Sequence, residues 1–301
     1  MIDVLRDNGL SPLLPEEATL ELLADGLDFT EGPLELADGS LLFQDIKATK
    51  TYRIAGPGAK AEVLRDATEA ANGQTFGPDG LVYFCEQDGR RFSRMRPDGT
   101  GYEVVVEEYQ GKRLNSPNDV VAHSSGTLVF TDPPYGVKPS DKALPFQGVF
   151  AYDRSGGLTL LVDDFAKPNG LAFSPDEKTL YICDTANYHV RAFDVVPHAS
   201  AGLALVAGSG RVFAKQDPGP PGGPDGLKVD REGRVYVAVA EGIWVYGPDG
   251  TLLGILGMPG RPSNLNWRGR DGSTLAITSG DKVYQIRTKV SGLTPIFLPH
   301  G

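Results

Sequence analysis

Short apolar runs separated by polar turns recur along the whole chain. Residues 170–184 read GLAFSPDEKTLYICD, in which two apolar runs flank a turn that contains Pro175 and Asp176. Such a pair of runs around a tight turn is typical of a β-hairpin. Pro-Asp-Gly sequences at 78–80, 97–99, 224–226 and 248–250 indicate further turns. We find no long amphipathic helical periodicity, so the pattern predicts a protein built from antiparallel strands.

The strand pairs belong to a larger repeat, and each copy opens with an oxygen-bearing side chain. The opening residues are Glu31, Asn72, Asn118, Asn169, Asp225 and Asn264, at spacings of 41, 46, 51, 56 and 39 residues. Repeats of this length, each with room for four short strands, predict an all-β fold: a six-bladed β-propeller with four-stranded blades around a central channel. A β-sandwich or barrel would explain the many strands but not the fixed place of the polar residue.

Ring closure makes further predictions. One domain is expected over residues 1–301, because a propeller closes as a single ring. The runs 18–24 (ATLELLA) and 282–288 (KVYQIRT) are expected to share a blade and so to close the ring. The loop 214–223 leads directly into Asp225 and is expected to border any site there.

The opening residues are expected to meet at one end of the channel, because each stands where an innermost strand begins. Carboxylate and amide oxygens suit a hard cation such as Ca²⁺ or Mg²⁺. We expect Glu31, Asn118, Asn169 and Asp225 to bind Ca²⁺, with Mg²⁺, Mn²⁺ or Zn²⁺ as alternatives. Asn-Gly and Asp-Gly are also common turn dipeptides, which is the alternative explanation. It explains Glu31 least well, because Glu is a poor turn former.

Five stretches resemble the signatures of the SMP-30/gluconolactonase/LRE family and cover nearly the whole chain in order. They are EGPLELADGSLLFQDI (31–46), NSPNDVV (115–121), LVFTDPPYG (128–136), KPNGLAFSPDEKTLYICDT (167–185) and PDGLKVDREGRVYVA (224–238). The resemblance implies a six-bladed propeller that holds a divalent ion, usually Ca²⁺, and hydrolyses sugar lactones and related esters. Related propellers cleave organophosphates.

The resemblance also implies roles for individual residues. Glu31, Asn169 and Asp225 match metal ligands, Asn118 matches an amide that contacts the metal or the substrate, and Asp225 matches the catalytic base. Arg113 and Tyr135 lie near the SPND and DPPYG motifs and are expected to contact substrate. Asn72 and Asn264 are expected to contact substrate or to support the ligands, with a structural role as the alternative.

A lactone hydrolase is therefore the leading functional hypothesis. A phosphotriesterase-like hydrolase on the same ion is a second, and a non-enzymatic propeller that binds a ligand is a third. Nucleophilic catalysis has little support, since the sequence contains no G-x-S-x-G elbow, H-E-x-x-H helix or phosphate-binding loop.

Composition and charge narrow the partners. The formal net charge is −10, which disfavours nucleic acid. Two cysteines do not make a disulfide framework, and no apolar run is long enough to span a membrane. We expect a cytoplasmic protein whose partner is a small-molecule lactone.

Overall fold

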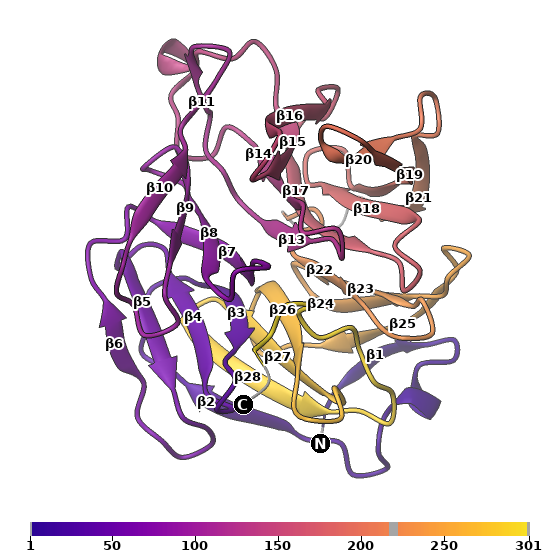
Figure 1. Ribbon diagram of the computed structural model, residues 1–301. Helices are drawn as coiled ribbons and strands as arrows, with labels where there is room; N and C mark the ends of the chain where they lie inside the picture. The colour runs from indigo at the N-terminus through magenta and orange to yellow at the C-terminus, as the bar shows by residue number, and fades with distance from the viewer. Residues whose placement is uncertain (1, 217–221, 300–301) are drawn as a thin grey trace.

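Six sheets follow one another around a central channel (Figure 1). The computed structural model describes residues 2–216 and 222–299, which form 28 strands and two short 3₁₀ helices. Each sheet is built mainly from strands that follow one another in the sequence. The six-bladed propeller predicted from the repeat is therefore confirmed. Of the loop expected beside the site, residues 217–221 lie outside the described residues.

Each blade runs from an inner strand beside the channel to an outer strand at the periphery. Blade 1 contains β3 (Thr30–Glu35), β4 (Leu41–Asp45), β5 (Lys50–Ile54) and β6 (Glu62–Arg65). Blade 2 contains β7 (Ala71–Phe76), β8 (Val82–Glu86), β9 (Arg91–Met95) and β10 (Glu103–Val106). Blade 3 contains β13 (Val120–Ala122), β14 (Leu128–Asp132), β15 (Gly148–Asp153) and β16 (Gly157–Val162).

The second half of the chain supplies most strands of the other three blades. Blades 4 and 5 have five strands each, and blade 6 has four. Blade 4 contains β17 (Pro168–Phe173), β18 (Thr179–Asp184), β19 (His189–His198), β20 (Gly202–Leu205) and β21 (Arg211–Lys215), the last two both pairing with β19. Blade 5 contains β22 (Leu227–Val229), β23 (Val235–Val239), β24 (Gly242–Tyr246), β25 (Leu252–Gly257) and β1 (Val4–Asp7). Blade 6 contains β26 (Pro262–Arg268), β27 (Thr274–Ser279), β28 (Lys282–Arg287) and β2 (Leu20–Ala24).

The ring closes through blade 6, as the sequence predicts. Strand β2 pairs antiparallel with β28, with Leu20 opposite Ile286 and Leu22 opposite Tyr284. The N-terminal segment thus supplies the outer strand of a blade whose other strands are the last of the chain. Strand β1 goes further and adds a fifth strand to blade 5 beside β25, which we did not predict.

The core lies between neighbouring blades. Because a blade is covered on both faces, its second strand is buried almost throughout and does not alternate between buried and exposed residues; all five residues of β14 are buried. Tyr236 of blade 5 meets Trp267 of blade 6 edge to face, with ring centroids 5.0 Å apart. Leu10, from the segment between β1 and β2, completes the same cluster.

Three of the four Pro-Asp-Gly sequences form hairpin turns. Gly80, Gly99 and Gly250 have φ angles of 72°, 84° and 83°, which only glycine adopts without strain. The Asp249 side chain accepts a hydrogen bond from the backbone of Thr251, as expected in such turns. The fourth sequence, 224–226, does not turn back into a hairpin; it leads into the inner strand β22.

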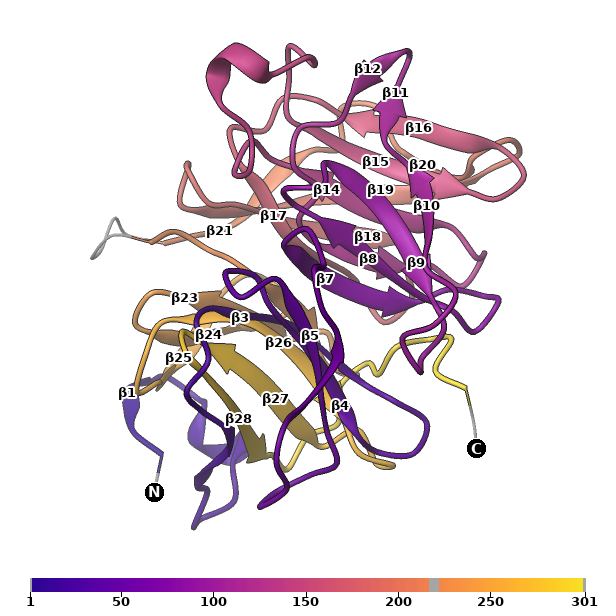
Figure 2. The same cartoon turned by 90° about the vertical axis from the view of Figure 1, so that its left-hand side faces the viewer.

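Two kinds of element lie outside the blades. The hairpin of β11 (Glu108–Tyr109) and β12 (Lys112–Arg113) extends beyond the outer strand β10, away from the inner strand β7 (Figures 1 and 2). The helices η1 (Ser11–Leu13) and η2 (Pro139–Asp141) are single turns. Within residues 2–216 and 222–299, no helix is long and apolar enough to cross a lipid bilayer.

Candidate active site at one mouth of the channel

In four of the six repeats a glycine follows the opening residue, and it lets the backbones of neighbouring inner strands come into direct contact. A Cβ placed on Gly32 would lie 2.3 Å from the carbonyl oxygen of Asn72, and one on Gly170 would lie 2.5 Å from that of Asp225. Gly73 and Gly226 are similarly crowded by the next blade. The Gly170 amide donates to the Asp225 carbonyl at 3.1 Å. The Asn-Gly and Asp-Gly pairs are therefore not turns; they draw the opening residues of adjacent blades together.

The opening residues converge on a cavity of about 510 Å³ at the mouth where the inner strands begin. Six of the predicted site residues line it: Glu31, Asn72, Asn118, Tyr135, Asn169 and Asp225. They come from five different blades, since Asn118 and Tyr135 both belong to blade 3. Circular closure thus places side chains almost 200 residues apart in one cavity.

Two predicted residues lie elsewhere. Arg113 is on β12, where its guanidinium donates to the Gly89 carbonyl at 3.0 Å, outside the cavity lining as the described residues define it. Its substrate contact stays a prediction without support from its position. Asn264 is buried below the cavity and donates to Asp119 Oδ2 at 3.3 Å. This position favours a supporting role for Asn264 over direct substrate contact.

The two acidic side chains of the cavity, Glu31 and Asp225, are largely shielded from water and lie close to other carboxylates. Glu31 is 3% exposed and Asp225 is 8% exposed. Burial raises the pKa of Glu31 well above its usual range, and the carboxylates of Asp225 and Asp119 raise it further. Burial raises the pKa of Asp225 to about 7, against the opposing effect of the Arg261 guanidinium. A cation at this place would offset both the cost of desolvation and the repulsion.

The amides bring further oxygen atoms to the same place. Asn72 Oδ1 is buried and has no hydrogen-bond partner among the described residues. Asn169 donates through Nδ2 to the Tyr135 hydroxyl at 3.2 Å. Within residues 2–216 and 222–299, no three His, Cys, Asp or Glu side chains are grouped so that they could hold a metal ion by themselves. Any cation site here is therefore a mixed one, in which amide oxygens and the carboxylates of Glu31 and Asp225 would coordinate the ion together.

The structure adds residues that the sequence reasoning missed. Asp119 follows Asn118 and is fully buried beneath the cavity, where burial raises its pKa and Lys228 opposes that rise. The Lys228 ammonium lies 3.8 Å from Asp119 Oδ2. At the rim, Arg261 lies 3.8 Å from Asp225 Oδ2, and the Lys167 ammonium lies 5.4 Å from the centre of the Tyr135 ring. One signal was available for Asp119, because most copies of the repeat carry glycine at that position.

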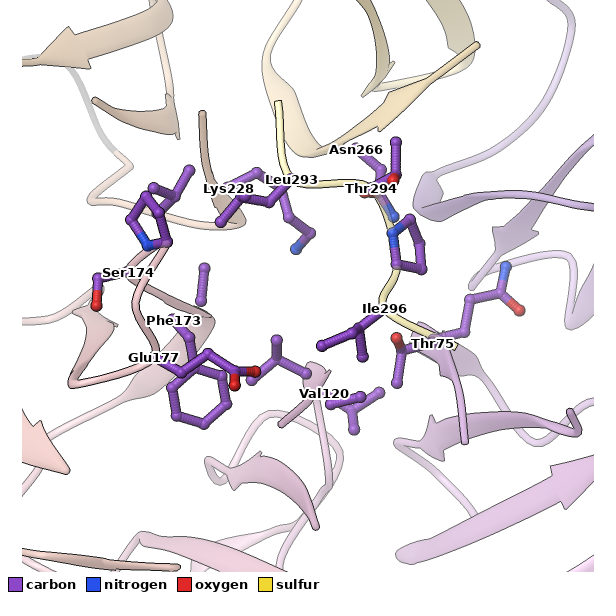
Figure 3. Close-up of a pocket in the computed structure, with 17 residues that line it drawn as sticks. Thr75, Val120, Phe173, Ser174, Glu177, Lys228, Asn266, Leu293, Thr294 and Ile296 are labelled. Carbon is purple, nitrogen blue, oxygen red and sulfur yellow. The ribbon is translucent and has the colours of Figure 1, made fainter. Parts of the chain in front are cut away.

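A second cavity, of about 260 Å³, lies at the opposite mouth of the channel (Figure 3). Its walls are mainly apolar, and the C-terminal segment around Leu293 and Ile296 crosses it. Glu177 and Lys228 point into it (Figure 3), but Glu177 accepts a hydrogen bond from Ser124 and Lys228 is beside Asp119. The carboxylate of this mouth, Glu177, and its amides, Gln74 and Asn266, are hydrogen-bonded within the protein, so this mouth is the weaker candidate for chemistry.

Known proteins resemble this chain in both sequence and fold. A family model described as an SMP-30/Gluconolactonase/LRE-like region matches residues 29–281. The gluconolactonase of Zymomonas mobilis subsp. mobilis is 34% identical over 305 residues, which cover 94% of this chain and 85% of that protein. Pentonolactonase XacC of Haloferax volcanii is 28% identical over 257 residues, covering 83% and 80%.

A solved structure agrees with the sequence relatives. XC5397 from Xanthomonas campestris, described as a gluconolactonase, superposes with a TM-score of 0.83 at 33% identity, over 95% of both chains. The stretch matched by the family model begins just before Glu31 and ends just after β27, so it includes every opening residue of the repeat. The chain belongs to the SMP-30/Gluconolactonase/LRE-like family.

Proposed function

We propose that the protein is a divalent-metal-dependent hydrolase that opens sugar lactones. The observation that carries the proposal is the convergence of Glu31, Asn118, Asn169 and Asp225 on one cavity. The family and the names of the relatives, a gluconolactonase and a pentonolactonase, support the substrate class.

The residues present fit a hard divalent cation. Glu31 and Asp225 are buried acids that repel each other, and a positive ion relieves that repulsion. Asn72 Oδ1 is buried and has no hydrogen-bond donor in the described part of the chain. A bound cation would supply the positive partner that this oxygen lacks. Two carboxylates and several amides suit Ca²⁺ best, with Mg²⁺ and Mn²⁺ next; the donor set contains neither the imidazole nor the thiolate that Zn²⁺ favours.

The chemistry follows from what these side chains can do to a cyclic ester. A bound cation supplies Lewis-acid polarisation of the lactone carbonyl and of a nearby water. Asp225 accepts a proton from the attacking water, whose oxygen bonds to the carbonyl carbon. The bond from that carbon to the ring oxygen then breaks, and the ring oxygen takes the proton that Asp225 holds to become a hydroxyl, which restores the carboxylate. The product is the open-chain hydroxy acid.

Other residues of the mouth orient the substrate. The Tyr135 hydroxyl accepts a hydrogen bond from Asn169 and is also close to the Thr185 hydroxyl, so its own proton can be donated to Thr185 or to a substrate oxygen. Burial raises the pKa of Tyr135 to about 12, which keeps that proton in place at neutral pH. The Lys167 and Arg261 side chains line the same mouth and give it positive charge that attracts a polar, oxygen-rich ligand.

Hydrolysis of glucono-1,5-lactone, followed by acid release in a pH-stat, tests the proposal. Activity should vanish after exhaustive chelation with EDTA and return with Ca²⁺, Mg²⁺ or Mn²⁺. Full activity in the chelated protein would refute the metal requirement. A fluorophosphate ester assayed in parallel distinguishes the phosphotriesterase alternative, and failure to turn over either compound would favour a binding protein.

A further inference from the structure

The second strand of each blade ends beside the loop that leads into the inner strand of the same blade. The last residues of these six strands are Asp45, Glu86, Asp132, Asp184, Val239 and Ser279. The three aspartates are at most 1% exposed, and each accepts hydrogen bonds from two successive backbone amides. Glu86 binds side chains instead, including Arg91 and Ser93.

The three aspartates hold the same register in their blades. Asp45 binds the amides of residues 28 and 29, Asp132 those of 115 and 116, and Asp184 those of 166 and 167. In every case these amides are three and two residues before the opening residue of the blade. Those opening residues are Glu31, Asn118 and Asn169, three of the four proposed metal ligands. In the other three blades the second strand ends in Glu86, Val239 or Ser279, and the opening residues are Asn72, Asp225 and Asn264, respectively.

In blade 4 the residue after the aspartate extends this arrangement to a second ligand. The Thr185 amide donates to the Lys167 carbonyl at 3.0 Å, and the Thr185 hydroxyl donates to the Pro224 carbonyl at 2.7 Å. Pro224 directly precedes Asp225. Thr185 therefore ties the approach to Asn169 to the approach to Asp225, across the boundary between two blades.

The same hydroxyl decides which way the Asn169 amide faces. A threonine hydroxyl has one proton, and here the Pro224 carbonyl, which only accepts, takes it. The atom of Asn169 that lies 3.1 Å from Thr185 Oγ1 must then be the donor, Nδ2. The second Nδ2 proton goes to the Tyr135 hydroxyl. Both amide protons are thereby engaged, and Oδ1 is the atom left for a cation.

We propose that Thr185, held in place by Asp184, is a positioning residue that orients the Asn169 amide and ties it to the Asp225 segment. This inference rests on the proposed function, in that it takes Asn169 and Asp225 to be ligands of one ion. Thr185 acts through those two residues. Removing its hydroxyl frees the Asn169 amide to rotate and loosens Pro224, without removing any ligand.

Metal affinity measured apart from catalysis tests this. Thr185→Val keeps the shape of the side chain and removes the hydroxyl, and Thr185→Ser keeps the hydroxyl. Tb³⁺ binding is followed by tyrosine-sensitised emission and Ca²⁺ by displacement of Tb³⁺. Changes in groups that orient ligands typically cost about 10- to 100-fold in affinity, so Thr185→Val should raise the Ca²⁺ dissociation constant by at least about tenfold. Thr185→Ser should restore it to within about threefold of the wild type.

Thr288→Val is the matched control. Thr288 is buried away from the site, and its hydroxyl lies 2.7 Å from the Val290 carbonyl and 3.0 Å from the Ser273 carbonyl, so its one proton is donated to backbone. Its loss should lower the melting temperature about as much as Thr185→Val does, while metal affinity stays at the wild-type value. A Thr185→Val protein that binds Ca²⁺ like the wild type, or a loss of affinity in Thr288→Val of equal size, would overturn the inference alone. A wild-type protein that binds neither ion would overturn the proposed function, and this inference with it.

Discussion

Replacing Gly170 with alanine tests how closely the inner strands of blades 4 and 5 must approach. Gly170 follows Asn169 and packs against the backbone of Asp225 and Gly226. A Cβ at this position would lie 2.5 Å from the Asp225 carbonyl oxygen and 2.5 Å from Gly226 Cα. Ordinary contacts begin at 3.4 Å, so the strands have to separate by about 0.9 Å. Backbone atoms surround the site, so no flexible side chain can give way.

The cost has two parts. Overpacking of this kind typically destabilises by about 1–3 kcal/mol. Separation of the strands also breaks the 3.1 Å hydrogen bond from the Gly170 amide to Asp225, worth about 1 kcal/mol. The total of about 2–4 kcal/mol corresponds to a fall in Tm of roughly 3–6 °C for a chain of this size. Because Asn169 and Asp225 move apart by nearly 1 Å, kcat/KM for the lactone should fall by about 100-fold.

Calorimetric melting and the pH-stat assay measure the two effects. Gly247→Ala is the control, because a Cβ there meets only the Asp249 side chain closely, with the next atom 3.7 Å away. That variant should melt within about 2 °C of the wild type and keep its activity. A Gly170→Ala protein that behaves like the control would refute the claim that this glycine sets the spacing of the mouth.

Three further outcomes follow from the structure. Ca²⁺ at 100 times its dissociation constant should stabilise the wild type by about 2.7 kcal/mol, and Glu31→Gln should abolish most of that rise in Tm; an equal rise in both proteins would contradict a role for Glu31 in metal binding. Burial raises the pKa of Asp132 to about 7, whereas an unfolded Asp titrates near 3.9, so the folded state holds the extra proton between about pH 4 and 7. Stability should therefore rise as pH falls through that window, by at most about 4 kcal/mol from this group, and urea midpoints of Asp132→Asn should show a flatter profile; equal slopes would count against it. Leu23→Ala, in β2 and 5% exposed, should cost about 2–4 kcal/mol in guanidinium unfolding, and an unchanged midpoint would mean that blade 6 does not depend on this contact.

The repeat made the fold and most of the mouth predictable. A polar residue in the same phase of each copy specifies a ring, and a ring brings Glu31 and Asp225 together without any local signal linking them. The pairing of β2 with β28 was predictable for the same reason, because a closed ring needs a partner for its last strand. The pairing of β1 with β25 was not, since nothing in four exposed or half-buried residues specifies that edge.

Residues outside the repeat were predicted less well, because proximity in sequence is a poor guide to position in a loop. Arg113 is five residues before Asn118, yet the β11–β12 hairpin carries it away from the channel. Thr185 and Arg261 reach the cavity from loops whose course depends on tertiary contacts. Asn-Gly pairs were ambiguous at the sequence level, since both a turn and a close approach of two backbones require glycine.

The closure of blade 6 affects how the chain folds while it is being synthesised. Strands β1 and β2 leave the ribosome before any of the blades, yet their partners are residues 252–257 and 282–287. At a synthesis rate of about 5–20 residues per second, β2 waits roughly 15–50 seconds for β28. During that time its pairing edge is open and the earlier blades have no closed ring to join. Slower translation or a crowded nascent chain should therefore harm the yield of this protein more than a change in the stability of any single finished blade.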